Sequence, residues 1–232
     1  MTTILAIETS SECASVALLY GNELISRALP GTGAAHSGNV LPGIHLLMAD
    51  AQLGLASLDV IAFGRGPGAF TGVRLACGVA QGLALGVDRP VAAISSLEAL
   101  ALPAARAGSR LYCAMDARMN EAYIGRFLVV DGRLVADGEV VCVPPAEAPL
   151  PESDGWTGLG TAFAAYAGLW PQALAHQVSF PGVQATPLAE DVARLAAARP
   201  DCWLDAALAA PEYVRNRVAL TTAERLAQGG RA

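Results

Sequence analysis

A glycine-rich run at residues 64–74 constrains the fold more than any other feature of this chain. The run reads Gly-Arg-Gly-Pro-Gly-Ala-Phe-Thr-Gly-Val-Arg, follows an apolar, strand-like segment at residues 59–63 and leads into a long helical pattern. Glycines between a strand and a helix leave backbone N–H groups directed at one spot, where phosphate or another oxyanion can bind. The run therefore predicts a strand–turn–helix junction, used either as a phosphate cradle or as a tight turn.

The same run lacks the lysine that phosphate-transferring loops of the Walker type carry after their last glycine. The omission extends to the whole chain, because all 15 basic residues are arginines. The missing lysine favours the tight turn over phosphate binding.

The composition limits the class of protein. Hydrophobic residues make up 53% of the 232 residues and charged residues only 16%, which is an apolar balance for a soluble chain. No stretch approaches the roughly 20 uncharged residues that a membrane-spanning helix requires, and the N-terminus lacks the basic region of a secretory signal. We therefore expect a cytoplasmic protein without membrane segments, whose sheets are buried on both faces and whose remaining apolar surface contacts a partner.

The cysteines and the net charge exclude two kinds of site. Five cysteines are scattered without a C-x-x-C pair, which is typical of reduced cytoplasmic thiols and not of disulfides or a zinc site. The formal charge of −6 argues against direct nucleic-acid binding, since that affinity comes mainly from basic side chains.

The apolar pattern predicts two halves of mixed α/β structure. In the first half, turn-linked runs predict an antiparallel meander, followed by helix, strand, helix, strand and helix; these elements are expected at residues 4–10, 14–20, 23–28, 37–53, 59–63, 71–85, 90–94 and 96–102. A boundary follows at residues 103–109. The second half repeats this order loosely, with strands and then helices expected at residues 111–116, 121–130, 134–143, 157–160, 161–169, 188–198 and 202–209.

Two helices of the first half carry distinctive faces. The helix at residues 37–53 has apolar side chains at spacings of three and four, and the helix at residues 71–85 has Gly78 and Gly82, with Gly86 continuing the spacing. Because glycine inside a helix costs about 1 kcal/mol relative to alanine, the repeated glycines indicate close approach by another element. Both helices could simply cover their own lobe, but the sequence favours a surface for a partner.

Five motifs occur in one order across nearly the whole chain. They are Ile-Glu-Thr-Ser at residues 7–10, His-Ser at 36–37 with Leu-Pro at 41–42, the glycine run, Asp-Ala-Arg at 116–118 and Pro-Glu-Tyr-Val-Arg at 211–215. Together they resemble the bacterial TsaB (YeaZ) family, which takes part in making threonylcarbamoyladenosine in tRNA. Ala69 replaces a commoner serine and Val214 a commoner leucine, and neither disturbs the match.

The resemblance implies an α/β, actin-like (ASKHA) fold of two ribonuclease-H-like lobes, each a mixed sheet with flanking helices. We expect the first lobe, with the partner-binding helices, at residues 1–106 and the second at residues 107–232. The resemblance also implies a catalytic relative of the same fold, TsaD, which holds a metal on two histidines of an Asn-His-Leu-Glu-Gly-His stretch. Ser96 and Leu100 occupy those positions here, and leucine cannot ligate a metal, so no metal site and no catalytic residue are predicted.

A degenerate nucleotide or phosphate cleft is a further expectation. Its candidate residues are Glu8, Thr9, Ser10, Gly66, Gly68, Thr71, Asp116, Gly158 and Gly160. Some have a structural alternative: Glu8 can cap nearby backbone N–H groups at a strand end, and Asp116 can pair with Arg118 on the surface. We expect that the chain requires no cofactor, and ATP or ADP binding stays open.

Two functions of different classes follow. The first is a non-catalytic subunit that binds and activates a TsaD-like paralogue by shifting its conformational population; the resemblance implies a TsaE-like ATPase as a further partner and tRNA contact only through the complex. The interface candidates are His36, Val40, Leu41, Ile44, Leu47, Met48, Arg74, Gly78 and Gly82, which could also form a homodimer. The second is an actin-like ATPase or small-molecule kinase. A peptidase is disfavoured because the sequence offers neither a nucleophile constellation nor a zinc triad.

Overall fold

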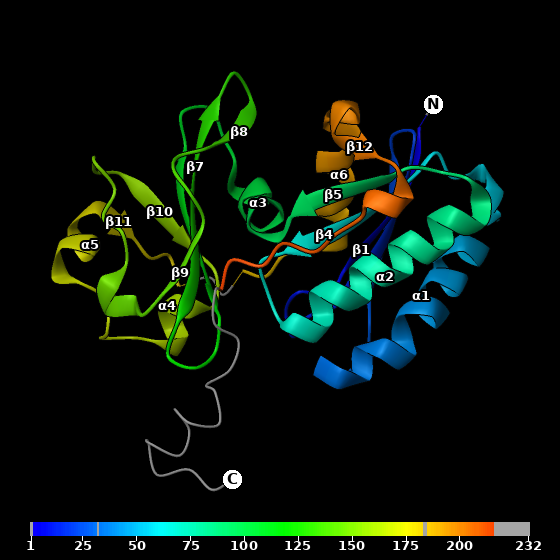
Figure 1. Ribbon diagram of the computed structural model, residues 1–232. Coiled ribbons are helices and arrows are strands. Elements are labelled where there is room, and N and C mark those ends of the chain that lie inside the picture. Colours follow the sequence, from blue (N-terminus) through cyan, green and yellow to red (C-terminus); the bar gives the residue numbers. More distant parts are fainter. Residues whose placement is uncertain (1, 32, 183–184, 216–232) are drawn as a thin grey trace, which may run out of the picture.

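The predicted meander opens the first lobe of the computed structural model, which describes residues 2–31, 33–182 and 185–215. Strands β1 (Thr3–Glu8), β2 (Ser15–Tyr20) and β3 (Glu23–Ala28) pair antiparallel, and β4 (Val60–Gly66) and β5 (Val91–Ser95) add parallel to β1. The short β12 (Trp203–Leu204) pairs antiparallel with β5. The first sheet thus has the order β12-β5-β4-β1-β2-β3 (Figure 1).

The second sheet repeats this arrangement. Strands β6 (Arg110–Asp116), β7 (Ala122–Val130) and β8 (Arg133–Ala136) form a second antiparallel meander, and β10 (Trp156–Leu159) and β11 (Val178–Ser179) continue parallel to β6. The order is β11-β10-β6-β7-β8, with β9 (Val141–Val143) paired to β7. Two mixed sheets of matching order, each with flanking helices, confirm the predicted fold class.

The helices are distributed over both faces of the sheets. Helices α1 (His36–Asp50) and α2 (Phe70–Val87) cover one face of the first sheet, and α6 (Ala189–Ala198) covers the other. Helix α3 (Ser96–Ala101) lies between the two sheets, whereas α4 (Ala162–Ala165) and α5 (Gln172–Gln177) pack on the outer side of the second (Figure 1). Short 3₁₀ helices span Gly33–Ala35, Leu55–Ser57, Leu102–Ala104, Pro145–Glu147, Pro200–Cys202 and Ala206–Leu208.

The core continues from one lobe into the other. Ile94 of the first sheet, Leu97 of α3 and Val192 of α6 belong to one buried cluster with Leu111 and Phe127 of the second sheet. Burial of each large apolar side chain contributes roughly 1.5–3 kcal/mol to stability. The two lobes are therefore joined by a shared apolar core and not only by chain connections.

Three expected elements of the second half were wrong. The strand at residues 134–143 is divided into β8 and β9, and the helix at residues 161–169 is reduced to α4, shortly before Gly168 adopts a φ of +80°. The helix at residues 202–209 is replaced by β12 and a 3₁₀ turn, in which the Asp205 carboxylate accepts a hydrogen bond from the Ala207 N–H.

The chain returns to the first lobe near its end. Helix α6 packs on β1 and β2, and β12 extends the first sheet. The division into lobes at residues 106 and 107 stays a prediction, but residues 189–204 of the second segment contribute to the structure of the first lobe.

Helix α2 is the one helix of the described residues with the length and apolar composition of a membrane span. It has 18 residues and a third of that window is buried. Its buried side chains, among them Val73 and Ala80, face the first sheet, as in the core helix of a globular protein. The length and composition of α2 alone therefore do not identify it as a membrane-spanning helix.

Candidate functional site

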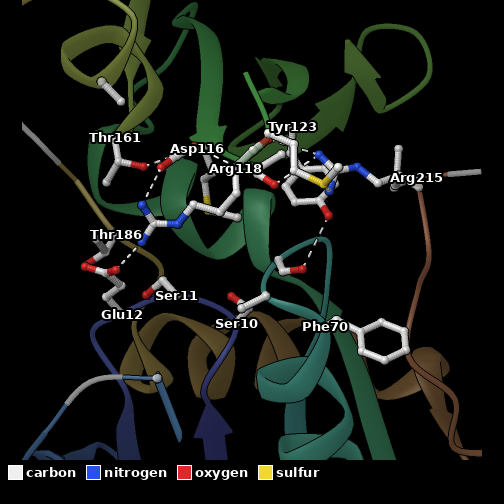
Figure 2. A pocket seen from close by; sticks show the side chains of 18 of the residues that line it. Ser10, Ser11, Glu12, Phe70, Asp116, Arg118, Tyr123, Thr161, Thr186 and Arg215 are labelled. Carbon is white, nitrogen blue, oxygen red and sulfur yellow. Dashed lines mark hydrogen bonds and ion pairs between the residues drawn. The ribbon is translucent and has the colours of Figure 1, made fainter. Parts of the chain in front are cut away.

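A cleft of about 830 Å³ lies between the two lobes (Figure 2). The first lobe contributes the β1–β2 turn, residues 10–13, and the start of α2, residues 68–70. The second lobe contributes the β6–β7 loop, residues 115–119, together with Tyr123 and Thr161, and residues 212–215 complete the wall. The cleft is large enough for a small-molecule ligand, since such pockets typically measure about 300–1,000 Å³.

The structure brings only part of the predicted cleft together. Ser10, Gly68 and Asp116 line it. Glu8, Thr9, Gly66 and Thr71 do not, and Glu8 and Thr9 are completely buried. Gly158 and Gly160 were also placed wrongly, because they line a separate apolar cavity of about 480 Å³ in the second lobe.

Glu8 holds the end of β1 to the start of α3. Its Oε1 accepts a hydrogen bond of 2.6 Å from the Ser10 N–H, and its Oε2 accepts one of 2.8 Å from the Ser96 hydroxyl. A Cβ on Gly64 would lie 1.9 Å from Oε2, so a glycine is needed beside this carboxyl group. Burial raises the pKa of Glu8, and the hydrogen bonds from Ser10 and Ser96 act in the opposite direction. Both oxygens thus have internal partners.

Ser96 and Leu100, where the resemblance implies that two metal ligands have been lost, have internal roles as well. The Ser96 hydroxyl is the donor to Glu8, and Leu100 belongs to the core that both lobes share. Within residues 2–31, 33–182 and 185–215, no group of three or more His, Cys, Asp or Glu side chains could hold a metal ion.

The glycine run fits α2 tightly against the β1–β2 turn. The Ala69 N–H donates a 2.7 Å hydrogen bond to the Ser10 carbonyl, and the Thr9 hydroxyl donates one of 2.7 Å to the Gly72 carbonyl. A Cβ on Gly68 would lie 2.4 Å from the Ser10 carbonyl oxygen, and one on Gly72 would lie 1.9 Å from that of Thr9. The Ser10 carbonyl thus takes the N–H at the N-cap of α2, where an anion could otherwise bind, and the Thr9 carbonyl lies against the side of the first turn. This geometry favours the tight turn.

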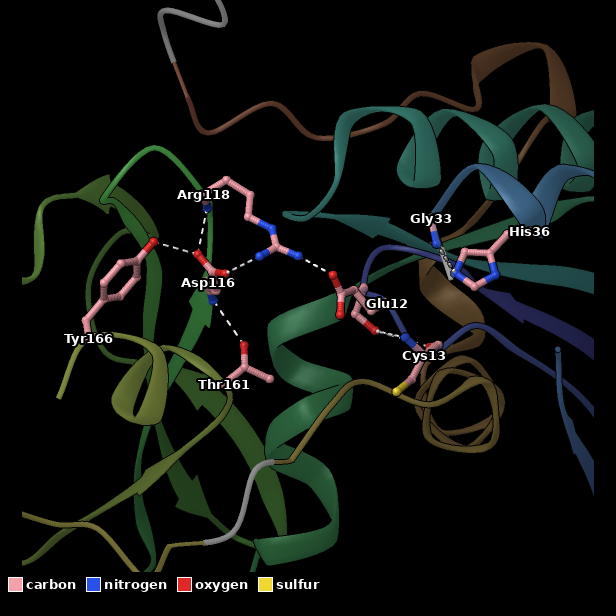
Figure 3. A network of polar contacts seen from close by, with 9 residues as sticks. Glu12, Cys13, Gly33, His36, Asp116, Arg118, Thr161 and Tyr166 are labelled. Atoms are coloured by element: carbon pink, nitrogen blue, oxygen red, sulfur yellow. Dashed lines mark hydrogen bonds and ion pairs between the residues drawn. The ribbon is translucent and has the colours of Figure 1, made fainter. Parts of the chain in front are cut away.

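Asp116 takes part in a network of polar contacts across the cleft (Figure 3). Its Oδ1 accepts hydrogen bonds from the Arg118 N–H at 2.7 Å and the Tyr166 hydroxyl at 2.6 Å, and its Oδ2 pairs with Arg118 at 3.1 Å. The Arg118 guanidinium also pairs with Glu12 of the first lobe. Burial and the hydrogen bond to Asp116 raise the pKa of Tyr166 to about 12. Asp116 therefore forms the ion pair with Arg118 that was its structural alternative to a role in ligand binding.

Residues 211–215, here called the strap, run along the cleft between the lobes (Figure 1). The Glu212 N–H donates a 2.8 Å hydrogen bond to the Arg65 carbonyl of β4, and the two side chains form an ion pair at 2.9 Å. Arg215 pairs with Glu121 at 2.5 Å in the second lobe. Sequence reasoning noted the strap as a motif but did not identify these contacts, because each joins residues far apart in the chain.

Several contacts at the cleft argue against a magnesium–nucleotide complex. Its two cations, Arg118 and Arg215, are already paired with carboxylates. The Ala69 N–H at the start of α2 is bonded to the Ser10 carbonyl, and Glu8 is enclosed by its own partners. We therefore derive no reaction step through a nucleotide.

The structure exposes some residues of the predicted partner surface and buries others. The side chains of His36, Val40, Ile44, Leu47 and Met48 are buried beneath α1 and cannot contact a partner without leaving the core. Leu41, Arg74, Gly78 and Gly82 are exposed on the outer side of α1 and α2, which lie side by side (Figure 1).

This outer side, here called the α1–α2 face, is apolar and open. Leu46 of α1 and Leu85 of α2, the latter 61% exposed, extend it. A Cβ on Gly78, Gly82 or Gly86 would meet nothing within 4 Å, so the helix backbone is accessible there. No described element of the chain approaches these glycines.

Several bacterial proteins are similar in sequence to this chain. Residues 30–230 match the family model of TsaD, described as tRNA N6-adenosine threonylcarbamoyltransferase. The chain is 40% identical over 183 residues to the tRNA threonylcarbamoyladenosine biosynthesis protein TsaB of Haemophilus influenzae, covering 71% of this chain and 74% of the relative. It is 32% identical over 224 residues to TsaB of Escherichia coli, covering 93% and 96%.

Solved structures show the same similarity. YeaZ from Pseudomonas aeruginosa superposes with a TM-score of 0.80 at 39% identity, covering 92% of this chain and all of that one. A second protein, described as similar to peptidase YeaZ from Pseudomonas aeruginosa, superposes with a TM-score of 0.82 at 37% identity, covering 93% and 100%.

Proposed function

Because this chain belongs to the TsaB (YeaZ) family and thus to tRNA threonylcarbamoyladenosine biosynthesis, we propose that it acts there as a non-catalytic, cytoplasmic subunit. It binds a TsaD-like paralogue, which transfers the threonylcarbamoyl group to the adenosine beside the anticodon. A TsaE-like ATPase is the further partner, and the chain meets tRNA only within the complex. Binding stabilises the active conformation of the paralogue, which is a population shift and not a chemical step.

One observation carries the non-catalytic part of the proposal. Two groups that could perform chemistry at the lobe junction are occupied by the chain itself: Glu8 by Ser10 and Ser96, and the Ala69 N–H at the start of α2 by the Ser10 carbonyl. Pairing of Arg118 and Arg215 with carboxylates leaves the cleft without a free cation among its lining residues.

The α1–α2 face supports the binding part. Its exposed leucines offer apolar area, whose removal from water contributes about 25 cal/mol per Å². Its glycines allow a partner helix to approach the backbone closely.

The test is a tRNA modification assay with the purified paralogue and ATPase, with and without this chain. We expect omission to abolish modification. Gly82→Leu should weaken binding to the paralogue by about tenfold or more, equivalent to about 1.4 kcal/mol, because the new side chain occupies the space that a partner helix needs. Its unfolding midpoint should not fall, since the site is open in the free chain and leucine favours a helix more than glycine does.

Ala173→Leu, at an exposed position of α5 in the second lobe, is the matched control and should bind normally. Equal tRNA modification without the chain would refute the proposal as a whole. Normal binding by Gly82→Leu would remove the α1–α2 face from it.

The size of the interlobe cleft favours the second candidate, an actin-like ATPase or small-molecule kinase. The occupied phosphate position and the paired arginines argue against it. Calorimetry with ATP and magnesium should therefore give no binding heat, whereas tight binding with turnover would replace the proposed function with this one.

A further inference from the structure

We propose that Arg215 is a positioning residue that clamps the β6–β7 loop in a strained conformation, and that the strap thereby links the α1–α2 face to the cleft. The clamp belongs to the free chain. Its relevance to partner activation rests on the proposed function.

The β6–β7 loop contains three successive non-glycine residues in the left-handed region. Arg118, Met119 and Asn120 have φ values of 62°, 55° and 59°. Asparagine adopts this region with little penalty, but arginine and methionine do so rarely because the Cβ crowds the following carbonyl. Met119 is 63% exposed, and its sulfur accepts a 3.6 Å hydrogen bond from Nη1 of Arg215, which lies outside the loop. The conformation therefore needs support from outside the loop.

Arg215 supplies that support. Its Nη2 donates hydrogen bonds to the carbonyls of Ala117 at 3.0 Å and Arg118 at 3.1 Å, while the guanidinium pairs with Glu121. The Arg215 side chain is only 14% exposed, which limits competition from water. Charge-assisted hydrogen bonds of this kind are stronger than neutral ones. One side chain thus contacts the beginning and the end of the loop.

The strap is attached to the first lobe just before Arg215. The Tyr213 hydroxyl accepts a 2.7 Å hydrogen bond from Arg74 of α2, and its ring lies 5.8 Å from that of Phe70. The Arg74 guanidinium lies 3.6 Å from the centre of the Phe70 ring. Figure 2 shows Phe70 beside the strap, and Arg215 reaching from the strap toward Tyr123.

The loop reaches back to the first lobe through a different contact. Arg118, the first left-handed residue, pairs with Glu12 across the cleft (Figure 3). A partner that moves Arg74 at the α1–α2 face therefore moves Tyr213, then Arg215, and with it the loop that carries Arg118. The strap thus links the α1–α2 face mechanically to the cleft.

Hydrogen exchange of the free chain tests the clamp. The amides of Ala117 and Glu121 are informative, because they donate to the carbonyls of Glu121 and Arg118 within the loop. A single nitrogen of Arg215, Nη2, makes the contacts with Ala117, Arg118 and Glu121. Arg215→Lys keeps the charge, but its side chain is one bond shorter, so the ammonium group falls short of the Nη2 position. We expect both amides to exchange about tenfold faster, with the Ile7 amide of β1 unchanged. Arg133→Lys, at an exposed arginine of β8, is the control.

A second variant separates clamping from general stabilisation. Met119→Gly in the Arg215→Lys background should restore protection of the Ala117 and Glu121 amides, because glycine adopts the left-handed region without strain. Exchange in Arg215→Lys within twofold of the wild type, or no recovery on adding Met119→Gly, overturns the clamp.

A third variant tests the link. Tyr213→Phe removes only the hydroxyl that contacts Arg74 and leaves Arg215 in place; we expect the same two amides to exchange about threefold faster. Unchanged exchange in this variant overturns the link to α2. All these measurements use the free chain, so they do not depend on whether a TsaD-like partner binds.

Discussion

At the scale of single residues, Glu8 and Asp191 are the carboxylates that the described part of the chain buries most completely, at 0% and 1% exposure. Glu8 accepts two hydrogen bonds at the end of β1, whereas Asp191 pairs with Arg194 at 3.0 Å within α6. Burial raises the pKa of both carboxyl groups. Ionisation of these two carboxyl groups should therefore make the free energy of unfolding depend on pH.

Asp191 allows that dependence to be measured. Burial raises its pKa from the ordinary 3.8 to about 6, against the opposing effect of Arg194. The folded state therefore binds more protons than the unfolded state between these values, so the stabilisation is complete below the lower pKa and is lost as the pH rises through the upper one. Asp191→Asn should be insensitive to this titration. We expect the free energy of unfolding of the wild type to fall relative to the variant by on the order of 2 kcal/mol between about pH 4 and about pH 7.

Urea denaturation at a series of pH values gives the difference. Asp131→Asn, at an exposed turn position, is the control and should follow the wild type. A difference between wild type and Asp191→Asn that does not change with pH would show that Asp191 titrates as it does in the unfolded chain.

The structural role of Glu8 shows the limit of sequence reasoning at this scale. The sequence predicted either a cleft acid or a cap for nearby N–H groups, and the Ser10 N–H fulfils the second. Its other partner, Ser96, lies 88 positions away. A contact of that separation exists only because β1 and the end of β5 are brought together by the sheet, which no local pattern reveals.

At the scale of elements, the apolar stripe of α1 illustrates a second limit. Val40, Ile44 and Leu47 were correctly expected on one helix face, but that face packs on the first sheet. Helical periodicity marks the side on which a helix is buried and does not distinguish a core from a docking surface. Leu41, which the sequence grouped with the stripe, is exposed, and the exposed Leu46 falls between the stripe positions, where periodicity gives no signal.

Glycines of α2 differ in role within one helix, which leads to a paired prediction. Gly72→Ala places a Cβ 1.9 Å from the backbone carbonyl oxygen of Thr9, and should lower the free energy of unfolding by at least about 2 kcal/mol. Gly82→Ala meets nothing within 4 Å, and should raise it by about 0.5–1 kcal/mol through better helix propensity. Chemical denaturation of both variants checks the signs. Equal effects would mean that α2 is not fitted to the β1–β2 turn as described.

Short elements explain most of the errors in the predicted secondary structure. Strands β11 and β12 have two residues each, less than is needed to show an alternating pattern. They form because a neighbouring strand already presents free backbone groups. By contrast, the long runs that became β1 to β7 carried enough apolar residues to be predicted with nearly correct bounds.

At the scale of the whole molecule, the repeated strand order and the shared core have different consequences. The repeat divides the structure into two similar sheets, and a loose repetition was already visible in the sequence. The cluster around Leu97 and Val192 nevertheless crosses from one lobe to the other. We expect the two lobes to unfold together despite the repeat, because unfolding one lobe would expose apolar surface of the other.

Tryptophan fluorescence can test this cooperativity. Trp203 reports on the first sheet, and Trp156 and Trp170 report on the second lobe. In Trp203→Phe, and in the double variant Trp156→Phe/Trp170→Phe, the fluorescence midpoint in urea should coincide with that from circular dichroism. Separate midpoints for the two lobes would show that the shared core does not couple them.

The return of α6 and β12 to the first sheet also bears on synthesis of the chain. Until residues 189–204 leave the ribosome, one side of the sheet that was made first, including Ile4 and Ala6, lacks its cover. The earliest part of the chain to emerge is therefore among the last to be completed. Nascent or truncated polypeptides that end before α6 should therefore be prone to aggregation and should depend on chaperones.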